Sequence, residues 1–285
     1  MRPGRWGRLL PRLLEHRGAL GGSVLLLGIL AAALLAPAVA PYDPARVPVD
    51  LAAASLRPPG KEHWLGTDLL GRDLFSRILY GARVSLLVGF AVALLTAAVG
   101  AAVGLLAGFY AGTIDAVFMR VTDAVMAFPA LVLAIAAVAV LDRPGLLGII
   151  LVLTAVQWTT VARLVRGQAL SLREREFVAA AYALGARDLR ILARHLLPNC
   201  AAPLLVSSTF GVASNILAEA GLSFLGLGIQ PPAVSWGSLL AEGAVYLTVK
   251  PWLVVFPGLA ITLTVLGCNL AGDGLRDLLE PRLTR

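Results

Sequence analysis

Long apolar runs recur along the chain and are separated by short polar segments. Most runs reach about 20 residues, the length at which an α-helix rising 1.5 Å per residue crosses the ~30 Å hydrocarbon layer of a bilayer. Pro129 interrupts the third run and is expected to kink or restart its helix, because proline removes a backbone hydrogen bond. The pattern predicts an all-α membrane protein with six transmembrane helices, at residues 20–40, 84–109, 114–141, 145–165, 201–226 and 251–272.

The composition supports this class of protein. Of the 285 residues, 58% are hydrophobic and 14% are charged, whereas soluble domains carry about 25% charged residues. A net charge of +7 could indicate nucleic-acid binding, but the basic residues flank the apolar runs and form no continuous stripe, so we expect no nucleic-acid partner. The first run is longer than the roughly 7–15 residues of a signal-peptide core. We therefore expect a retained span, and cleavage near "APAVAP" is the alternative.

The distribution of lysine and arginine predicts an orientation. If both termini lie in the cytoplasm, 16 of the 24 basic residues fall on the cytoplasmic side, which is the bias that membrane proteins show. The chain then divides into a tail with the first span and the start of an external loop (1–60), an external amphipathic lead-in (61–82), a transmembrane domain (83–273) and a cytoplasmic tail (274–285). In the lead-in, Thr67 or Asp68 is expected to cap a short helix.

A charged segment, "SLREREFVAAAYALGARDLRILARHLLPN", stands between the fourth and fifth runs. Ser171 and Glu174 have capping-box spacing and predict a helix that Gly185 ends, followed by a second helix that Pro198 closes. We interpret this helix–Gly–helix hairpin as a rigid docking element on the cytoplasmic face. The alternative is a hairpin lying on anionic headgroups, which needs a basic polar face. Three acidic residues interrupt that face: Glu174, Glu176 and Asp188.

The same segment resembles the cytoplasmic loop of ABC-importer permeases, whose pattern is E-A-A, three residues, Gly, nine residues, Ile, one residue and Leu-Pro. The matching residues are Ala179, Ala180, Ala181, Gly185, Leu197 and Pro198. The chain departs from the pattern where Ala179 replaces Glu and where His195 replaces Ile. Glu176, one turn earlier, is the candidate to supply the carboxylate that Ala179 lacks.

Longer stretches resemble the dipeptide, oligopeptide and nickel branch of that family, on the side of its C-type subunit. They are "HWLGTDLLGRDLFSRILYGARVSL", "ARLVRGQALSLREREFVAAAYALGA", "SFLGLGIQPPAVSWGSLLAEG" and "NLAGDGLRDLLEPRL". With the N-terminal tail and first span, the resemblance covers nearly the whole chain. It implies the transmembrane domain of a type I ABC importer, with residues 168–199 as the coupling loop.

The resemblance also implies a function and a set of partners. The chain would be the permease subunit of an ATP-driven importer in the cytoplasmic membrane of a bacterium or archaeon. It would pair with a B-type permease, two cytoplasmic ATPases and an external solute-binding protein. The cargo would be dipeptides, oligopeptides, nickel chelates or glutathione-like molecules. The ATPase contact would lie at Glu176, Phe177, Ala179, Ala180, Ala181, Gly185, Arg187, Leu197 and Pro198.

The residues themselves agree that the energy comes from another subunit. A phosphate-binding P-loop needs Gly-Lys-Ser/Thr, and neither of the two lysines, Lys61 and Lys250, stands in that motif. The two cysteines and three histidines have no metal-binding spacing, so we expect no metal and no cofactor. Paired carboxylates or a Ser/His/Asp set do not stand together at one level of the membrane either, so we expect no enzymatic activity. The rival interpretation is a self-powered secondary transporter or channel, which is expected to show inverted repeats and embedded ionisable groups.

Polar residues inside the apolar runs are candidates for a translocation pathway, because charge in lipid is costly and usually faces a protein interior. The candidates are Glu219 and Asn215, followed by Gln157, Thr159, Thr160 and Asn269. For Glu219 the alternative is a structural carboxylate bonded to the outer loop near "QPPAVSW".

Two further patterns concern helix packing. Gly100, Gly104 and Gly108 are four residues apart and share one helical face, where another backbone can approach closely. The alternative is that glycine is simply common in membrane helices. Arg120 and Asp123 are three residues apart at the start of the third run and predict a structural ion pair.

Overall fold

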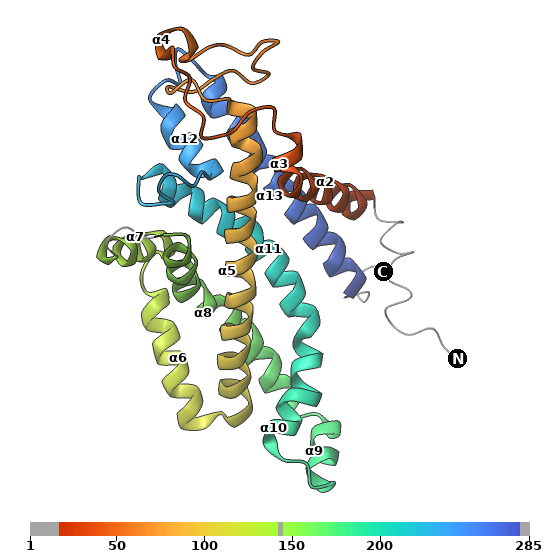
Figure 1. Cartoon of the computed structure of the whole chain (residues 1–285). Helices are drawn as coiled ribbons and strands as arrows, with labels where there is room; N and C mark the ends of the chain where they lie inside the picture. The colour runs from red at the N-terminus through yellow and green to blue at the C-terminus, as the bar shows by residue number, and fades with distance from the viewer. Residues whose placement is uncertain (1–16, 142–144, 280–285) are drawn as a thin grey trace.

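The computed structural model describes residues 17–141 and 145–279, and every regular element within these ranges is a helix. Figure 1 shows α5 running through the molecule, with α4 and α12 near one end and α9 and α10 at the other. The elements are α2 (Arg17–Leu34), α3 (Ala36–Val39), α4 (Leu51–Ala54), α5 (Leu74–Tyr110), α6 (Gly112–Met126), α7 (Ala130–Val140), α8 (Leu146–Arg173), α9 (Glu176–Ala183), α10 (Asp188–Ile191), the π-helix η2 (Leu192–Leu196), α11 (Leu197–Phe224), α12 (Trp236–Ala244) and α13 (Trp252–Leu279).

By length and composition, four of the described helical stretches can cross a membrane: α5, α8, α13 and the stretch Asp188–Phe224 that joins α10, η2 and α11. The pair α6 and α7 makes a fifth if it forms one span, and it is bent by 87°. Pro129 caps α7 at this bend, which confirms the expected interruption of the third run. The first run gives a shorter apolar helix, Gly18–Leu34, and Pro37 lies in the first turn of the separate helix α3. The six predicted spans are therefore matched by four or five on this criterion.

Glycines allow α5 to pack closely against α8. The three glycines of α5 at positions 100, 104 and 108 all face α8. A Cβ added to Gly104 would lie 2.5 Å from the carbonyl oxygen of Ala162, and one on Gly108 would lie 2.6 Å from the Cβ of Ala169. Both distances are too short for real atoms, so the two backbones approach as closely as they do because these positions have no side chain.

Ion pairs join α6 to α8. The guanidinium of Arg166 on α8 donates to both carboxylate oxygens of Asp115 on α6, at 2.5 and 2.6 Å. Asp123 pairs with Arg163, also on α8, at 2.5 Å. The predicted pair between Arg120 and Asp123 is therefore wrong. The carboxylate reaches a neighbouring helix instead of its own next turn, a tertiary contact that spacing along one helix does not reveal.

The lead-in of residues 61–82 is continuous with α5 and does not form a separate short helix. The side chain of Asp73 caps α5 by accepting a hydrogen bond from the backbone N–H of Ser76 at 2.8 Å. The expectation that Thr67 or Asp68 serves as a cap is wrong, because Asp68 instead accepts hydrogen bonds from the guanidinium groups of Arg72 and Arg77.

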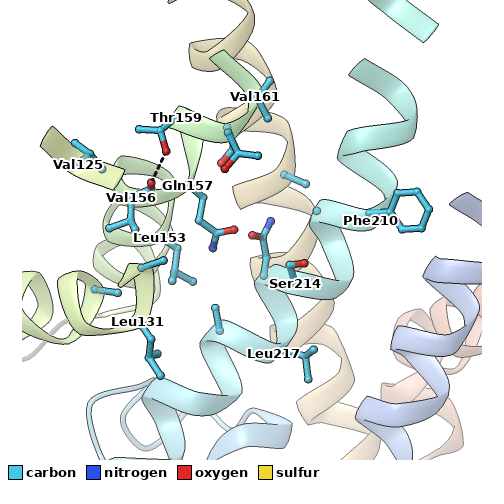
Figure 2. Close-up of a pocket in the computed structure, with 18 of the residues that line it drawn as sticks. Val125, Leu131, Leu153, Val156, Gln157, Thr159, Val161, Phe210, Ser214 and Leu217 are labelled. Atoms are coloured by element: carbon cyan, nitrogen blue, oxygen red, sulfur yellow. Dashed lines mark hydrogen bonds between the residues drawn. The ribbon is translucent and has the colours of Figure 1, made fainter. Parts of the chain in front are cut away.

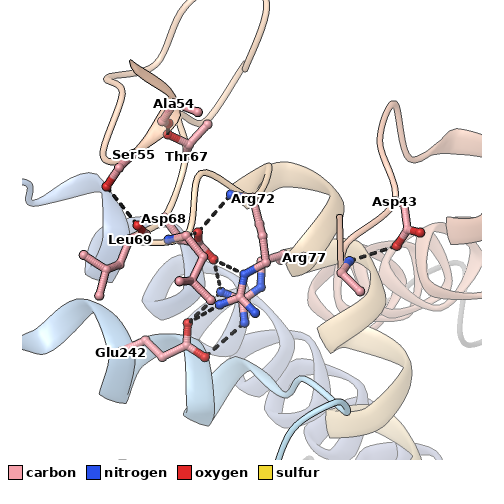
Figure 3. Close-up of polar contacts among 11 residues, drawn as sticks. Asp43, Ala54, Ser55, Thr67, Asp68, Leu69, Arg72, Arg77 and Glu242 are labelled. Atoms are coloured by element: carbon pink, nitrogen blue, oxygen red, sulfur yellow. Dashed lines mark hydrogen bonds and ion pairs between the residues drawn. The ribbon is translucent and has the colours of Figure 1, made fainter. Parts of the chain in front are cut away.

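Those two arginines also fasten the lead-in to α12, as Figure 3 shows. Arg77 donates to both carboxylate oxygens of Glu242, at 2.6 and 3.0 Å. Close by, the indole N–H of the buried Trp236 donates to the carbonyl oxygen of Ile78 at 3.0 Å. The N-terminal end of α5 is thus held to α12 by ion pairs and by a hydrogen bond.

Candidate functional sites: a polar cavity and a protruding helix

A cavity of about 750 Å³ lies between α5, α6, α7, α8 and α11. The break between α6 and α7 forms part of its wall, because Val125, Met126, Phe128, Ala130 and Leu131 all line it. Figure 2 shows Gln157 of α8 and Ser214 of α11 extending toward the space between their two helices. The cavity therefore depends on the interruption that Pro129 introduces into the third apolar run.

The polar lining of the cavity is uncharged. Among the described residues that line it, no Asp, Glu, Lys or Arg is present, and the remaining surface is aliphatic or aromatic. Hydroxyls and amides donate and accept hydrogen bonds but carry no charge with which to hold an ion. The cavity therefore suits a solute that carries hydrogen-bonding groups. The eight polar residues are Thr96, Gln157, Thr159, Thr160, Ser207, Ser208, Ser214 and Asn215.

Four of the six sequence-predicted pathway residues line this cavity, namely Gln157, Thr159, Thr160 and Asn215. Asn269 lies elsewhere, exposed on α13. Glu219 also lies outside the lining, and it is completely buried. Its Oε1 accepts hydrogen bonds from the hydroxyls of Ser223 at 2.6 Å and Ser235 at 2.7 Å. Ser235 belongs to "QPPAVSW", so the contacts are those of the alternative, a structural carboxylate bonded to the outer loop.

Sequence reasoning missed Thr96, which lines the cavity from α5 and is only 7% exposed. A threonine in a long apolar run gives little signal by itself, because its hydroxyl usually bonds to its own helix. The available clue is spacing: Thr96 stands four residues before Gly100 and so shares the face on which α5 approaches another helix.

The second site is α9, which lies at the opposite end of the molecule from α4 (Figure 1). Val178 and Ala181 are buried in one apolar cluster with residues of α5, α8 and η2. Gly185 has φ +78°, a left-handed conformation that favours glycine. Its N–H donates to the carbonyl oxygen of Tyr182 at 2.8 Å and ends the helix. The hairpin is therefore anchored on one face and turned sharply at its tip.

The remaining face of α9 and the turn after it are exposed. Leu184 and Leu189 are 88% and 77% exposed, which is unusual for large apolar side chains. The hydroxyl of Tyr182 donates to Asp188 at 3.0 Å. Partial desolvation and this hydrogen bond raise the pKa of Tyr182. Of the predicted contact residues, Ala181 is buried, whereas the exposed ones are Glu176, Phe177, Ala179, Ala180, Gly185, Arg187, Leu197 and Pro198.

Both predicted ends of the hairpin differ from the structure. Ser171 lies in the last turn of α8, and α9 begins at Glu176 with no side-chain cap, so no capping box forms with Glu174. Pro198 does not close the unit, because it stands in the first turn of α11. The wider π-helix before it removes the steric conflict between the proline ring and the preceding turn.

A bundle of apolar helices with an uncharged polar cavity, and with a partly apolar helix exposed at one end, defines a multi-pass membrane protein of the transport class. Residues 100–285 match the family model described as "binding-protein-dependent transport system inner membrane component". Residues 4–59 match the "N-terminal TM domain of oligopeptide transport permease C". The chain belongs to this family of inner-membrane permeases, which confirms the resemblance found in the sequence.

Curated relatives match over nearly the whole chain. A putative peptide transport system permease protein of Brucella abortus is 51% identical over 95% of this chain and 90% of its own length. The oligopeptide transport system permease protein OppC of Bacillus subtilis is 40% identical over 98% and 90%. The glutathione transport system permease protein GsiD of Escherichia coli is 41% identical over 98% and 91%.

Proposed function

We propose that the chain is the C-type permease subunit of an ATP-driven importer that carries peptides across a bacterial or archaeal cytoplasmic membrane. The relatives are named for peptides, oligopeptides and glutathione, which is itself a tripeptide. A cavity lined by hydroxyls and amides suits such cargo better than a metal ion. A nickel chelate is the second cargo that the sequence resemblance implies, and no contact in the cavity favours it.

The membrane topology belongs to the same proposal. We count α2 as the first span, because its 18 residues reach ~27 Å at 1.5 Å per residue, and we count the bent pair α6–α7 as the third. This gives six spans with both termini in the cytoplasm. Residues 1–60 hold the tail and first span, 61–82 the external lead-in, 83–273 the permease domain with its coupling loop at 168–199, and 274–285 the cytoplasmic tail.

The cavity is the proposed translocation pathway, with Gln157, Thr159, Thr160 and Asn215 in its wall. Ser214 and Leu217 line it from α11 and are nevertheless exposed, so the wall of one chain does not enclose a solute. A B-type permease packed against this side would complete it. Glu219 and Asn269, outside the lining, would act indirectly, by holding the outer loop and by contacting the partner subunit.

The observation that carries the proposal is that α8 connects the two sites. Gln157 lines the cavity, and α8 continues for 16 residues to Arg173, just before α9 begins. This distance is ~24 Å along one helix. Because Val178 and Ala181 of α9 share an apolar cluster with Val165 of α8, a displacement of α9 is transmitted to the cavity wall.

The energy source is assigned to partner subunits. Neither lysine of the chain stands in a P-loop, so the subunit is proposed to have no ATPase activity of its own. Two cytoplasmic ATPases would each bind one permease subunit. In this chain the contact would be the exposed face of α9 around Glu176, Ala180 and Gly185. An external solute-binding protein would deliver the cargo to the end that carries α4 and α12. The lipid bilayer surrounds the apolar helices.

The docking role is tested by Gly185→Pro and Ala180→Glu. Proline cannot adopt φ +78°, and a carboxylate at residue 180 would place an unpaired charge in the contact. Both variants are expected to abolish peptide uptake and to lose the ATPases on co-purification of the complex. The matched controls lie outside the cytoplasmic loop: Gly226→Pro, where φ is also +78°, and Ala52→Glu on the exposed surface of α4. Normal ATPase recovery with both test variants would contradict the docking role.

A further inference from the structure

Two side chains in the cavity wall hold polar atoms that the described protein leaves unpaired. They are Oγ1 of Thr96 on α5 and Oδ1 of Asn215 on α11, and neither atom has a hydrogen-bond partner among the described residues. Thr96 is 7% exposed and Asn215 is 2% exposed. Both residues line the cavity. Buried polar groups are normally paired, so these two exceptions mark a place where a ligand is expected to supply the partner.

The local contacts place the two atoms on one wall. The Nδ2 of Asn215 donates to the carbonyl oxygen of Gly89 on α5 at 3.2 Å, which fixes the amide and leaves Oδ1 free to accept. Gly89 and Thr96 are seven residues apart, two helical turns, and therefore share a face of α5. Ala93, between them on the same face, also lines the cavity. The two free atoms thus lie along the seam where α5 meets α11.

The hydroxyl of Thr96 is unusual for a threonine inside a helix. Thr154 and Thr264, which are also buried in long helices, each donate to the carbonyl oxygen four residues earlier, at 2.8 Å. Thr96 makes no such bond. Its hydroxyl and the side-chain carbonyl oxygen of Asn215 are therefore both left without a hydrogen-bond partner among the described residues.

We propose that Thr96 and Asn215 form a binding site for the backbone amides of a peptide in transit. The proposal rests on the proposed function, because it names the cargo contact within the same cavity. Asn215 Oδ1 is an acceptor and a hydroxyl can act as one, so the pair matches peptide N–H groups. Every peptide offers such N–H donors, whatever its side chains. The described lining residues carry no charge, so they form no ion pair with the charged termini of the peptide. The site recognises the peptide backbone and not its side chains.

The test uses the complete complex, with its partner permease, ATPases and binding protein, in proteoliposomes. The probes are trialanine and its depsipeptide analogue, in which ester oxygens replace the two peptide N–H groups. Uptake is measured at saturating concentrations of binding protein loaded with each probe, so that delivery is the same for every variant. The variants are Thr96→Val and Asn215→Leu. Thr264→Val is the control, because its hydroxyl is bonded to its own helix.

Each variant is expected to lower trialanine uptake roughly three- to tenfold, the factor that one hydrogen bond supplies, while depsipeptide uptake changes little. Thr96→Ser, which keeps the hydroxyl, is expected to restore trialanine uptake. If Thr96→Val does not assemble, as judged by co-purification, Thr96→Ala against Thr96→Ser gives the same comparison. For Asn215, the Asn215→Asp variant keeps an acceptor oxygen and is expected to retain more trialanine uptake than Asn215→Leu.

The other outcomes separate the two proposals. Unchanged trialanine uptake in the variants, or an equal loss for both probes, overturns the amide site and leaves the transport function standing. Uptake of neither probe by the wild-type complex, whose binding protein is loaded, overturns the peptide-import function and the amide site with it.

Discussion

At the scale of single residues, the contact between the lead-in and α12 depends on a buried arginine. The side chain of Arg77 is only 4% exposed, and it pairs with Asp68, 5% exposed, and with Glu242 of α12, 42% exposed. Removing one partner of a buried ion pair leaves the other charge away from water, which is far more destabilising than losing an exposed pair. Replacing Arg77 is therefore expected to destabilise the contact between the lead-in and α12.

Arg77→Met is expected to lower the free energy of unfolding by about 3 kcal/mol, the low end for a broken buried pair, because Arg72 still bonds Asp68. Arg57→Met removes only the exposed pair with Glu62 and is expected to cost less than about 1 kcal/mol. Thermal unfolding of the purified protein in detergent measures both. Equal losses for the two variants would mean that burial of Arg77 does not determine its contribution.

Single residues also show what the sequence could and could not predict. Gln157 and Asn215 could be identified because amides stand out in an apolar run. For Thr96 the only sequence clue is its spacing from Gly100, because only tertiary structure reveals that its hydroxyl is unbonded. The spacing of Arg120 and Asp123 predicts a pair between them, but the carboxylate of Asp123 pairs with Arg163, because a spacing of three residues gives no information about a neighbouring helix. Partners on other helices are the information that one-dimensional spacing lacks.

At the scale of elements, the contact between α5 and α8 is determined by missing side chains. Gly104 and Gly167 are both glycines inside these two helices, but a Cβ on Gly104 would lie 2.5 Å from a backbone oxygen of α8, whereas one on Gly167 would have nothing within 4 Å. Alanine normally stabilises a helix relative to glycine by roughly 0.5–1 kcal/mol. Overpacking costs roughly 1–3 kcal/mol, so the same substitution should have opposite signs at the two positions.

Gly167→Ala is expected to raise the melting temperature, and Gly104→Ala is expected to lower it, when both proteins are unfolded thermally in the same detergent. The two variants add the same methyl group, so the difference in sign isolates the contact between the helices. An increase at both positions would show that α5 and α8 separate readily and that the glycines do not determine their distance.

The helix–Gly–helix hairpin shows which properties of an element are predictable. Gly185 predicts the sharp end of a helix, and α9 ends just before it. The boundaries were not predictable, because Ser171 can cap a new helix or continue α8, and the chain continues α8. Pro198 likewise stops a helix in general, but the π-helix η2 lets α11 run through it. Local sequence leaves such choices open, and packing decides them.

At the scale of the whole molecule, the two ends differ in how they are held. Charged groups around Arg77 fasten the lead-in to α12 at one end. An apolar cluster that contains Val178, Ile191 and Leu196 fastens α9 to the helices at the other. With 16 of the 24 basic residues on the side of α9 in the proposed topology, this second end is assigned to the cytoplasm.

Cysteine labelling tests that orientation with little background, because both native cysteines, Cys200 and Cys268, are buried. Val49→Cys introduces a thiol at a fully exposed position near α4, and Thr113→Cys introduces one at the exposed start of α6. A membrane-impermeant maleimide is expected to label residue 49 in intact cells and residue 113 only after permeabilisation. The protein without added cysteines measures the background. The reverse pattern would place α9 outside the cell, where cytoplasmic ATPases could not reach it, and transport would need another source of energy.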